Sequence, residues 1–82
     1  MMRVFKYPFE ITDDVEIKMP VGARVLHVAM QDDQPTLWAL VDDTHMAETH
    51  RFWLRGTGHP VPDGAKHVAT FFDGPFVWHL FR

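Results

Sequence analysis

A glycine-rich segment that directly follows an arginine is the most distinctive local feature of the sequence. Residues Gly56–Gly64 contain three glycines and two prolines, which excludes regular secondary structure and demands a fixed irregular path. Backbone N–H groups beside glycine can approach an anion closely, Thr57 can donate a hydrogen bond, and Arg55 or protonated His59 can offset negative charge. Arg55, Thr57, Gly58 and His59 are therefore one candidate site, for a small nucleotide-like anion. The alternative is a tight crossover that needs glycine for geometry alone, since the spacing matches no phosphate-binding fingerprint.

Histidines are the next residues whose chemistry matters, because imidazole is a common metal ligand. The chain has six histidines and no cysteine. His45 and His50 lie in an expected loop, the other four are dispersed, and we therefore expect no metal site. Three pairs of adjacent aspartates, at 13–14, 32–33 and 42–43, each fall at an expected turn, where aspartate bonds to nearby backbone N–H groups.

Covalent catalysis lacks its usual nucleophiles in this chain. Serine and cysteine, the two commonest, are both absent. Threonine remains, without a visible base beside it, and no histidine–aspartate pair has a telling spacing. We therefore expect a protein that is not an enzyme, with no catalytic residues and no cofactor.

An aromatic residue between two arginines forms the second candidate site. In the segment 51–55 the alternation places Phe52 and Leu54 on one face and Arg51, Trp53 and Arg55 on the other. Tryptophan and arginine are favoured anchors at protein interfaces. This face predicts contact with another protein.

Charge and hydropathy exclude several partners. With 8 basic and 11 acidic residues the formal net charge is −3, and the basic residues are scattered singly, so we expect no nucleic-acid binding. No apolar run approaches the roughly 20 residues that span a membrane, and no signal peptide is visible. We expect a cytoplasmic protein with no membrane contact.

Apolar and polar residues alternate over most of the chain, which is typical of strands with one buried face. Residues 4–9 predict a strand that lies at a sheet edge or ends near Pro8, because proline cannot donate to a ladder. Residues 15–19 predict a half-buried strand, and residues 23–30 a strand with both faces largely covered.

The second half of the chain continues this pattern. The polar segment 31–35 predicts a hairpin loop that leads into a strand at 36–41. Residues 42–49 predict a loop before the strand at 51–55. We therefore expect an all-β, mainly antiparallel fold, one domain over residues 1–82, in which six to seven short strands form a curled sheet, a barrel or a sandwich.

The last two expected strands, 67–72 and 76–81, flank the turn Asp73-Gly74-Pro75 and predict a second hairpin. The terminal strand carries no acidic residue or lysine. If it lies at an edge, it invites pairing with another chain, and we therefore expect a homodimer.

Four segments, taken in their order along the chain, resemble those of a known protein family. They are residues 6–13 (KYPFEITD), 37–42 (LWALVD), 56–62 (GTGHPVP) and 76–81 (FVWHLF). The chain resembles a family of small uncharacterised proteins of bacteriophages and bacterial prophages. The resemblance assigns no catalytic or binding residues and implies an accessory role, such as inhibition of a host or defence protein by direct contact. The alternative is a small-ligand binder or sponge that uses the Gly56–Gly64 loop.

Overall fold

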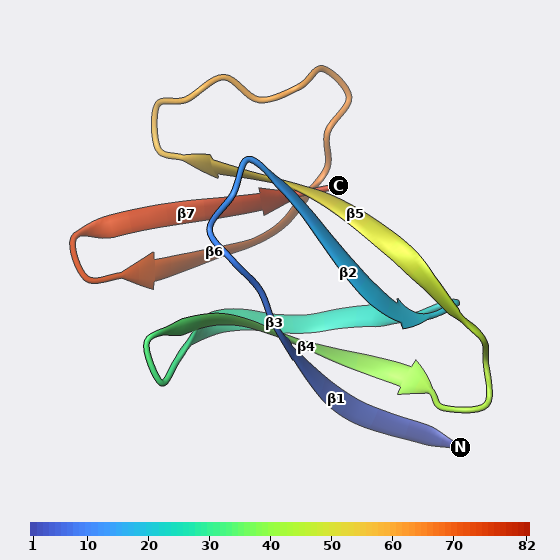
Figure 1. Ribbon diagram of the computed structural model, residues 1–82. Coiled ribbons are helices and arrows are strands. Elements are labelled where there is room, and N and C mark those ends of the chain that lie inside the picture. The colour runs from blue at the N-terminus through green and yellow to red at the C-terminus, as the bar shows by residue number, and fades with distance from the viewer.

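The computed structural model describes residues 1–82 and contains seven β-strands and no helix. The strands are β1 (Met2–Pro8), β2 (Asp14–Pro20), β3 (Arg24–Gln31), β4 (Gln34–Asp42), β5 (Ala47–Gly56), β6 (His67–Asp73) and β7 (Phe76–Phe81). All neighbouring strands are antiparallel (Figure 1). The all-β, mainly antiparallel fold predicted from the alternating pattern is confirmed. The structure has no helix with the length and apolar character that crossing a membrane requires.

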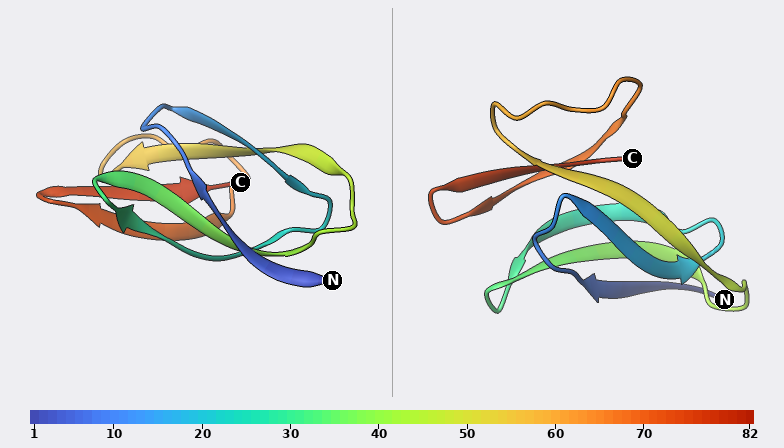
Figure 2. Two further views of the ribbon diagram at one scale, coloured as in Figure 1. Left: turned by 60° about the horizontal axis from the view of Figure 1, so that its bottom comes forward. Right: turned by 45° about the horizontal axis from the view of Figure 1, so that its top comes forward.

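Two sheets pack face to face around one core. One sheet has the strand order β1-β4-β3 and the other has the order β2-β5-β7-β6. Figure 2 shows the two layers, with the long loop after β5 on the far side of the four-stranded sheet. Thirteen buried apolar residues, contributed by both sheets, form a single cluster between the layers. Of the three arrangements expected from the sequence, the sandwich is therefore the one observed.

The alternation that predicted strands also determines which side chains enter this core. In β2, Val15, Ile17 and Met19 are buried and the charged residues between them are exposed. In β5, Phe52 and Leu54 are each only 2% exposed. His50, two residues before Phe52, is buried on the same face. Because side chains alternate between the faces of a strand, Arg51, Trp53 and Arg55 point outward from the sandwich.

The hairpin of β3 and β4 is confirmed, with a tighter turn than expected. The strands extend into the predicted loop, so that the turn consists of Asp32 and Asp33, with φ of 51° and 62°. Aspartate tolerates this left-handed region better than most residues, and the twist of such a turn matches that of the strands.

The expectation that both faces of β3 are covered was wrong. A bulge between Val25 and His27 gives Leu26 no partner on β4, and Leu26 is exposed. His27 is also exposed, because no further layer covers the outer face of the three-stranded sheet.

The predicted loop at 42–49 was too long. Strand β5 begins at Ala47, and Ala47, Glu48 and Thr49 pair with β2. Alanine and glutamate are uncommon in strands, but β2 offers hydrogen-bond partners along this stretch, which outweighs that preference. Only residues 43–46 form the connection between β4 and β5.

A cluster of charges fastens the start of β1 to the end of β4. The ammonium group of Met1 donates to Asp43 (3.0 Å) and Asp42 (3.2 Å). Hydrogen bonds from the hydroxyl and backbone N–H of Thr44, and then from the ammonium group, hold the pKa of Asp42 well below its ordinary value. Arg3 and then the ammonium group lower the pKa of Asp43. The two carboxylates, Asp43 first, raise the pKa of the Met1 ammonium group.

The first strand of the chain lies at a sheet edge, whereas the last strand lies in the interior of its sheet. Strand β1 pairs only with β4 and is an edge strand, as Pro8 predicted. Strand β7 lies between β5 and β6, so the condition on which the terminal strand predicted a homodimer is not met. The unguarded sequence 76–81 reflects an interior strand, which needs no charged residues against pairing.

Candidate functional site

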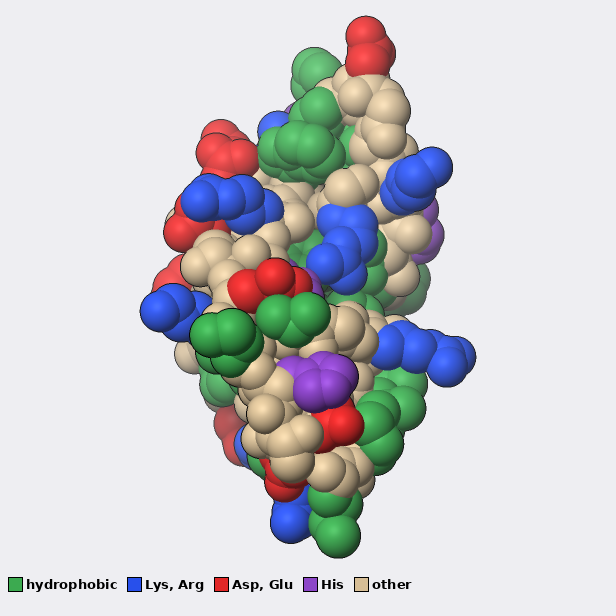
Figure 3. All heavy atoms as spheres, turned by 90° about the vertical axis from the view of Figure 1, so that its right-hand side faces the viewer, with side chains coloured by type: hydrophobic (Ala, Val, Ile, Leu, Met, Phe, Trp, Pro, Cys, Tyr) green, Lys and Arg blue, Asp and Glu red, His purple; other side chains and the backbone are tan.

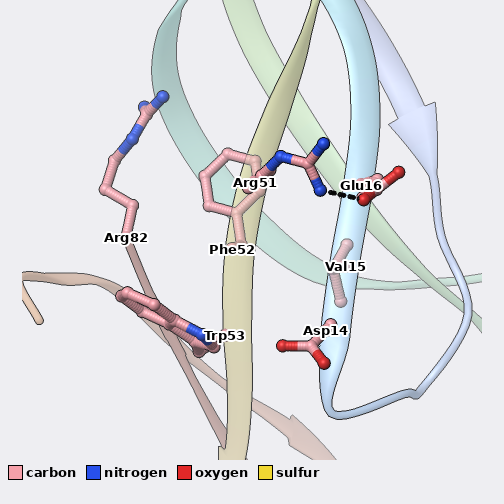
Figure 4. A pocket seen from close by; sticks show the side chains of 7 residues that line it. All are labelled: Asp14, Val15, Glu16, Arg51, Phe52, Trp53 and Arg82. Atoms are coloured by element: carbon pink, nitrogen blue, oxygen red, sulfur yellow. Dashed lines mark hydrogen bonds and ion pairs between the residues drawn. The ribbon is translucent and has the colours of Figure 1, made fainter. Parts of the chain in front are cut away.

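The outward face of β2 and β5 carries Trp53 among charged side chains. The register places Asp14 opposite Trp53 and Glu16 opposite Arg51. Arg51 forms an ion pair with Glu16, and in Figure 4 this pair lies between β5 and β2 while the indole of Trp53 points away from it. Arg82, which follows β7, lies on the same side of β5 as the indole in this view. We name these five residues together the Trp53 surface.

A cavity of about 360 Å³ opens at the Trp53 surface. Two buried core residues, Val15 and Phe52, also line it. The Arg82 guanidinium lies 4.9 Å from the centre of the Phe52 ring and donates to His50 Nδ1 at 3.1 Å. The volume is that of a small ligand pocket or of a socket for one side chain of a partner.

Of the three residues predicted to contact a protein partner, two lie together at this cavity, whereas the third, Arg55, bonds to backbone oxygens of the protein itself. Arg51 and Trp53 share the cavity, as the alternation predicted. Arg55 Nε donates to the carbonyl oxygen of Pro60 (3.1 Å), and Nη1 donates to those of Asp13 (2.8 Å) and Leu54 (2.9 Å). Arg55 therefore holds the long loop against the segment that precedes β2.

Glycine is favoured at all three glycine positions of the Gly56–Gly64 loop, for two different reasons. Gly58 and Gly64 have φ of +89° and +79°, a conformation that side-chain-bearing residues rarely adopt. At Gly56 the backbone is ordinary, but a Cβ would lie 3.1 Å from Cε1 of His59. The loop thus has the fixed irregular path expected from its composition.

Thr57 has a base beside it that the sequence pattern does not reveal. Its hydroxyl is 2.8 Å from His79 Nε2, and His79 Nδ1 is 2.9 Å from the hydroxyl of Thr70. The Thr70 hydroxyl is in turn 2.9 Å from His67 Nε2. A hydroxyl can donate or accept, and an imidazole ring can do both, so these contacts form a continuous chain of hydrogen bonds. This chain of hydrogen bonds fastens the loop to the outer face of β7.

A second cavity, of about 490 Å³, lies between this loop and the β6–β7 hairpin. Thr57 and His59 line one side, and Phe76 and Trp78 line the other. The two rings of the hairpin stack, with centres 6.3 Å apart and planes inclined by 29°. Arg55 is not among these lining residues. It lines a third cavity, of about 420 Å³, together with His59, so His59 borders both cavities while Thr57 and Arg55 border different ones.

The end of the β6–β7 hairpin exposes two large aromatic residues that sequence reasoning did not single out. Phe72 is 69% exposed and Phe76 is 60% exposed. We call residues 72–76 the hairpin tip. Their position beside the predicted Asp73-Gly74-Pro75 turn was the available signal, because residues next to a hairpin turn have few neighbours to cover them.

The two histidines that were considered as metal ligands have structural partners. His45 Nδ1 lies 2.9 Å from the carbonyl oxygen of Val21, and His50 Nε2 lies 3.3 Å from that of Pro20. No three histidine, aspartate or glutamate side chains are grouped so that they could hold a metal ion. On the face seen in Figure 3, basic and acidic side chains are interspersed among apolar ones.

One family matches the chain over its whole length. It is described as Domain of unknown function (DUF7352), and the match covers residues 1–82, so the chain belongs to this family. No curated protein and no solved structure matches the chain.

Proposed function

We propose that this DUF7352 protein is a non-catalytic accessory protein that binds another protein through the Trp53 surface. The observation that carries the proposal is the position of Trp53, half-buried on the outside of a sheet and beside a cavity that the core residues Val15 and Phe52 also line. Binding energy at interfaces concentrates in tryptophan and arginine side chains that sit in such well-packed surroundings.

The charges around Trp53 suit a protein partner. Arg51 and Arg82 are balanced by Asp14 and Glu16, so the surface has no excess of one sign to attract a polyanion. An aromatic centre with a polar rim is the usual anatomy of a protein interface. The carboxylate of Asp14 has no hydrogen-bond partner within the chain and is available to a basic residue of the partner.

The partner class in this proposal is a host or defence protein, and the setting is a phage or prophage. The support is the resemblance of residues 6–13, 37–42, 56–62 and 76–81 to small phage proteins, together with the small size of the domain. A protein of 9.6 kDa without an evident catalytic centre acts most simply by occupying a surface of a larger protein.

A matched pair of tryptophan variants tests this proposal. Trp53→Ala removes the centre of the surface, whereas Trp38→Ala removes a half-buried tryptophan from the outer face of the other sheet. The tagged protein and both variants are passed over a bacterial lysate, and the retained partner is purified and titrated by calorimetry. We expect Trp53→Ala to weaken binding at least tenfold, about 1.4 kcal/mol, and Trp38→Ala to leave it unchanged. Equal binding by all three proteins would refute the proposal.

The second cavity favours one alternative function, the binding of a small planar anion. Phe76 and Trp78 offer a stacked pair of rings, Thr57 offers a hydroxyl, and protonated His59 offers a charge. Thermal-shift titrations with nucleotides and cyclic dinucleotides test this alternative. Saturable stabilisation that His59→Ala abolishes would support it and would remove the protein-binding proposal from first place.

A further inference from the structure

We infer that two copies of this chain associate edge to edge through β1, so that their three-stranded sheets join into one sheet of six strands. This inference is independent of the Trp53 surface, which belongs to the other sheet. It starts from the position of β1, whose only neighbour is β4 (Figure 2). A strand with one neighbour has a row of backbone groups free to pair with another chain.

The direction of the free backbone groups follows from two hydrogen bonds at the ends of β1. The N–H of Phe9 donates to the carbonyl oxygen of Pro35, and the N–H of Asp43 donates to the carbonyl oxygen of Met1. In an antiparallel pair, successive residues of a strand direct their N–H and C=O groups alternately toward and away from the partner. The odd-numbered residues of this segment therefore bond to β4.

The even-numbered residues Met2, Val4 and Lys6 consequently direct their N–H and C=O groups to the open side. Pro8 falls on the same side, where its missing N–H costs no bond to β4. Met2 and Val4 are each 56% exposed, so the open edge also has apolar side chains to bury.

The other three edges are protected against such pairing. Strands β3 and β6 each carry a bulge that interrupts their register. Strand β2 exposes Asp14, Glu16 and Lys18 at every second position and ends at Pro20. Bulges and regularly spaced charges are common devices against edge-to-edge association.

The sequence of β1 selects one register for a second copy of itself. Around a two-fold axis at Val4, the bonded pairs are Val4 with Val4 of the second copy and Met2 with Lys6 of the second copy. Every residue in these pairs has an N–H to donate. Arg3 then lies opposite Phe5 of the second copy, so no like charges are opposed, and each Arg3 is already paired with Asp43.

The other registers in which two β1 strands could pair around a nearby two-fold axis are less favourable. An axis at Phe5 would pair Met2 with Pro8 of the second copy and lose a donor. An axis at Lys6 would place two lysines directly opposite each other, which is destabilising.

Cysteine cross-linking tests the register, because the chain has no cysteine of its own. In the inferred dimer the two Val4 residues form a bonded pair with Cα atoms about 5.5 Å apart, within disulfide range, whereas the two Phe5 residues are diagonal, about 7–8 Å apart. We expect Val4→Cys to form a disulfide-linked dimer at least tenfold faster than Phe5→Cys under mild oxidation, read by non-reducing electrophoresis. Equal rates, or a faster Phe5→Cys, would overturn this register.

Sedimentation velocity tests the association itself in the unmodified protein. The weight-average mass should rise from 9.6 kDa toward twice that value with concentration. Val4→Pro removes the outward N–H without touching the bonds to β4, and it should keep the protein monomeric, while Val4→Thr should still associate. Trp53→Ala should not alter the dimer, which separates this inference from the proposed function. A monomer at every concentration up to about 1 mM, where an association of −4.1 kcal/mol would be half complete, would overturn the inference.

Discussion

The four-stranded sheet presents two aromatic regions to solvent, the Trp53 surface and the hairpin tip, and it supports them differently. Trp53 lies in a strand with neighbours on both sides, above the buried side chains of Val15 and Phe52. The hairpin tip extends beyond Gly56, the last residue of β5, so that Phe76 pairs with β6 alone.

This difference shows that exposed apolar area alone does not identify an interface. Phe72 and Phe76 are more exposed than Trp53, but no packed layer fixes their position. Trp53 combines partial exposure with a fixed base and a balanced polar rim. Fixed side chains lose less conformational entropy when a partner binds, which is why we propose the Trp53 surface rather than the hairpin tip as the binding site.

Truncating Phe52, the core residue next to Trp53 in β5, should have the largest effect on the free energy of unfolding. Phe52 is 2% exposed and belongs to the core cluster. We expect Phe52→Ala to lower the free energy of unfolding by about 3–5 kcal/mol and Phe52→Leu by about 1 kcal/mol, measured by urea titration with tryptophan fluorescence. A loss below about 1 kcal/mol for Phe52→Ala would remove the distinction between a supported and an unsupported region.

Substitutions in the Gly56–Gly64 loop should have an intermediate effect on the free energy of unfolding. Nothing lies within 4 Å of an added Cβ at Gly58, so Gly58→Ala should cost about 1–2 kcal/mol through its positive φ alone. Gly56→Ala should cost less, and His59→Ala should relieve that cost because the conflict is with the His59 ring. Urea titrations of Gly56→Ala and Gly58→Ala, each with and without His59→Ala, test this prediction. A recovery of stability when His59→Ala is added to Gly58→Ala would contradict it.

Truncation at the hairpin tip should have a smaller effect. Phe72 is 69% exposed, and Phe72→Ala should change the free energy of unfolding by less than about 0.5 kcal/mol. The same urea titration measures it. A loss comparable to that of Phe52→Ala would show that the tip is packed in solution, against a second copy or another part of the chain.

The charge cluster at β1 lies on the other sheet and should give the smallest and most separable effect. The lowered pKa values of Asp42 and Asp43 mean that the two carboxylates stabilise the folded state above the ordinary carboxyl pKa of 3.8. This stabilisation is lost as the pH falls below that value. The raised pKa of the Met1 ammonium group acts in the opposite direction, so its contribution is present below 8.0 and is lost as the pH rises above the folded value.

The measurement for this prediction is the unfolding free energy from pH 2 to 10 for the unmodified protein, Asp42→Asn and Trp53→Ala. Asp42→Asn should flatten the acid limb, and Trp53→Ala should leave the pH dependence unchanged because it lies on the other sheet. An acid limb that Asp42→Asn does not alter would show that the cluster is not formed in solution.

Much of the fold was predictable because the alternation of apolar residues is local. It gave the buried set of β2, the outward position of Trp53 and both hairpins. The sequence could not show the bulge at Leu26, because apolar residues occupy both odd and even positions from Val25 to Met30, so a shift of the alternation by one residue leaves no mark in the pattern. It also missed the strand at 47–49, which shows no alternation of its own and pairs because β2 lies beside it.

The candidate site was predictable only in part, for a related reason. Trp53 and Arg51 belong to one strand, and their common face follows from their spacing. Asp14, Glu16 and Arg82 reach the same cavity from β2 and the end of β7. Their meeting depends on strand order, which no local pattern encodes, and the same is true of His79 beside Thr57.

The most direct test of the assignment is a calorimetric titration of the purified partner with the unmodified protein, Trp53→Ala and Phe72→Ala. We expect Trp53→Ala to raise the Kd at least tenfold and Phe72→Ala to change it less than twofold. The reverse result, with binding lost at the hairpin tip and retained without Trp53, would contradict the account.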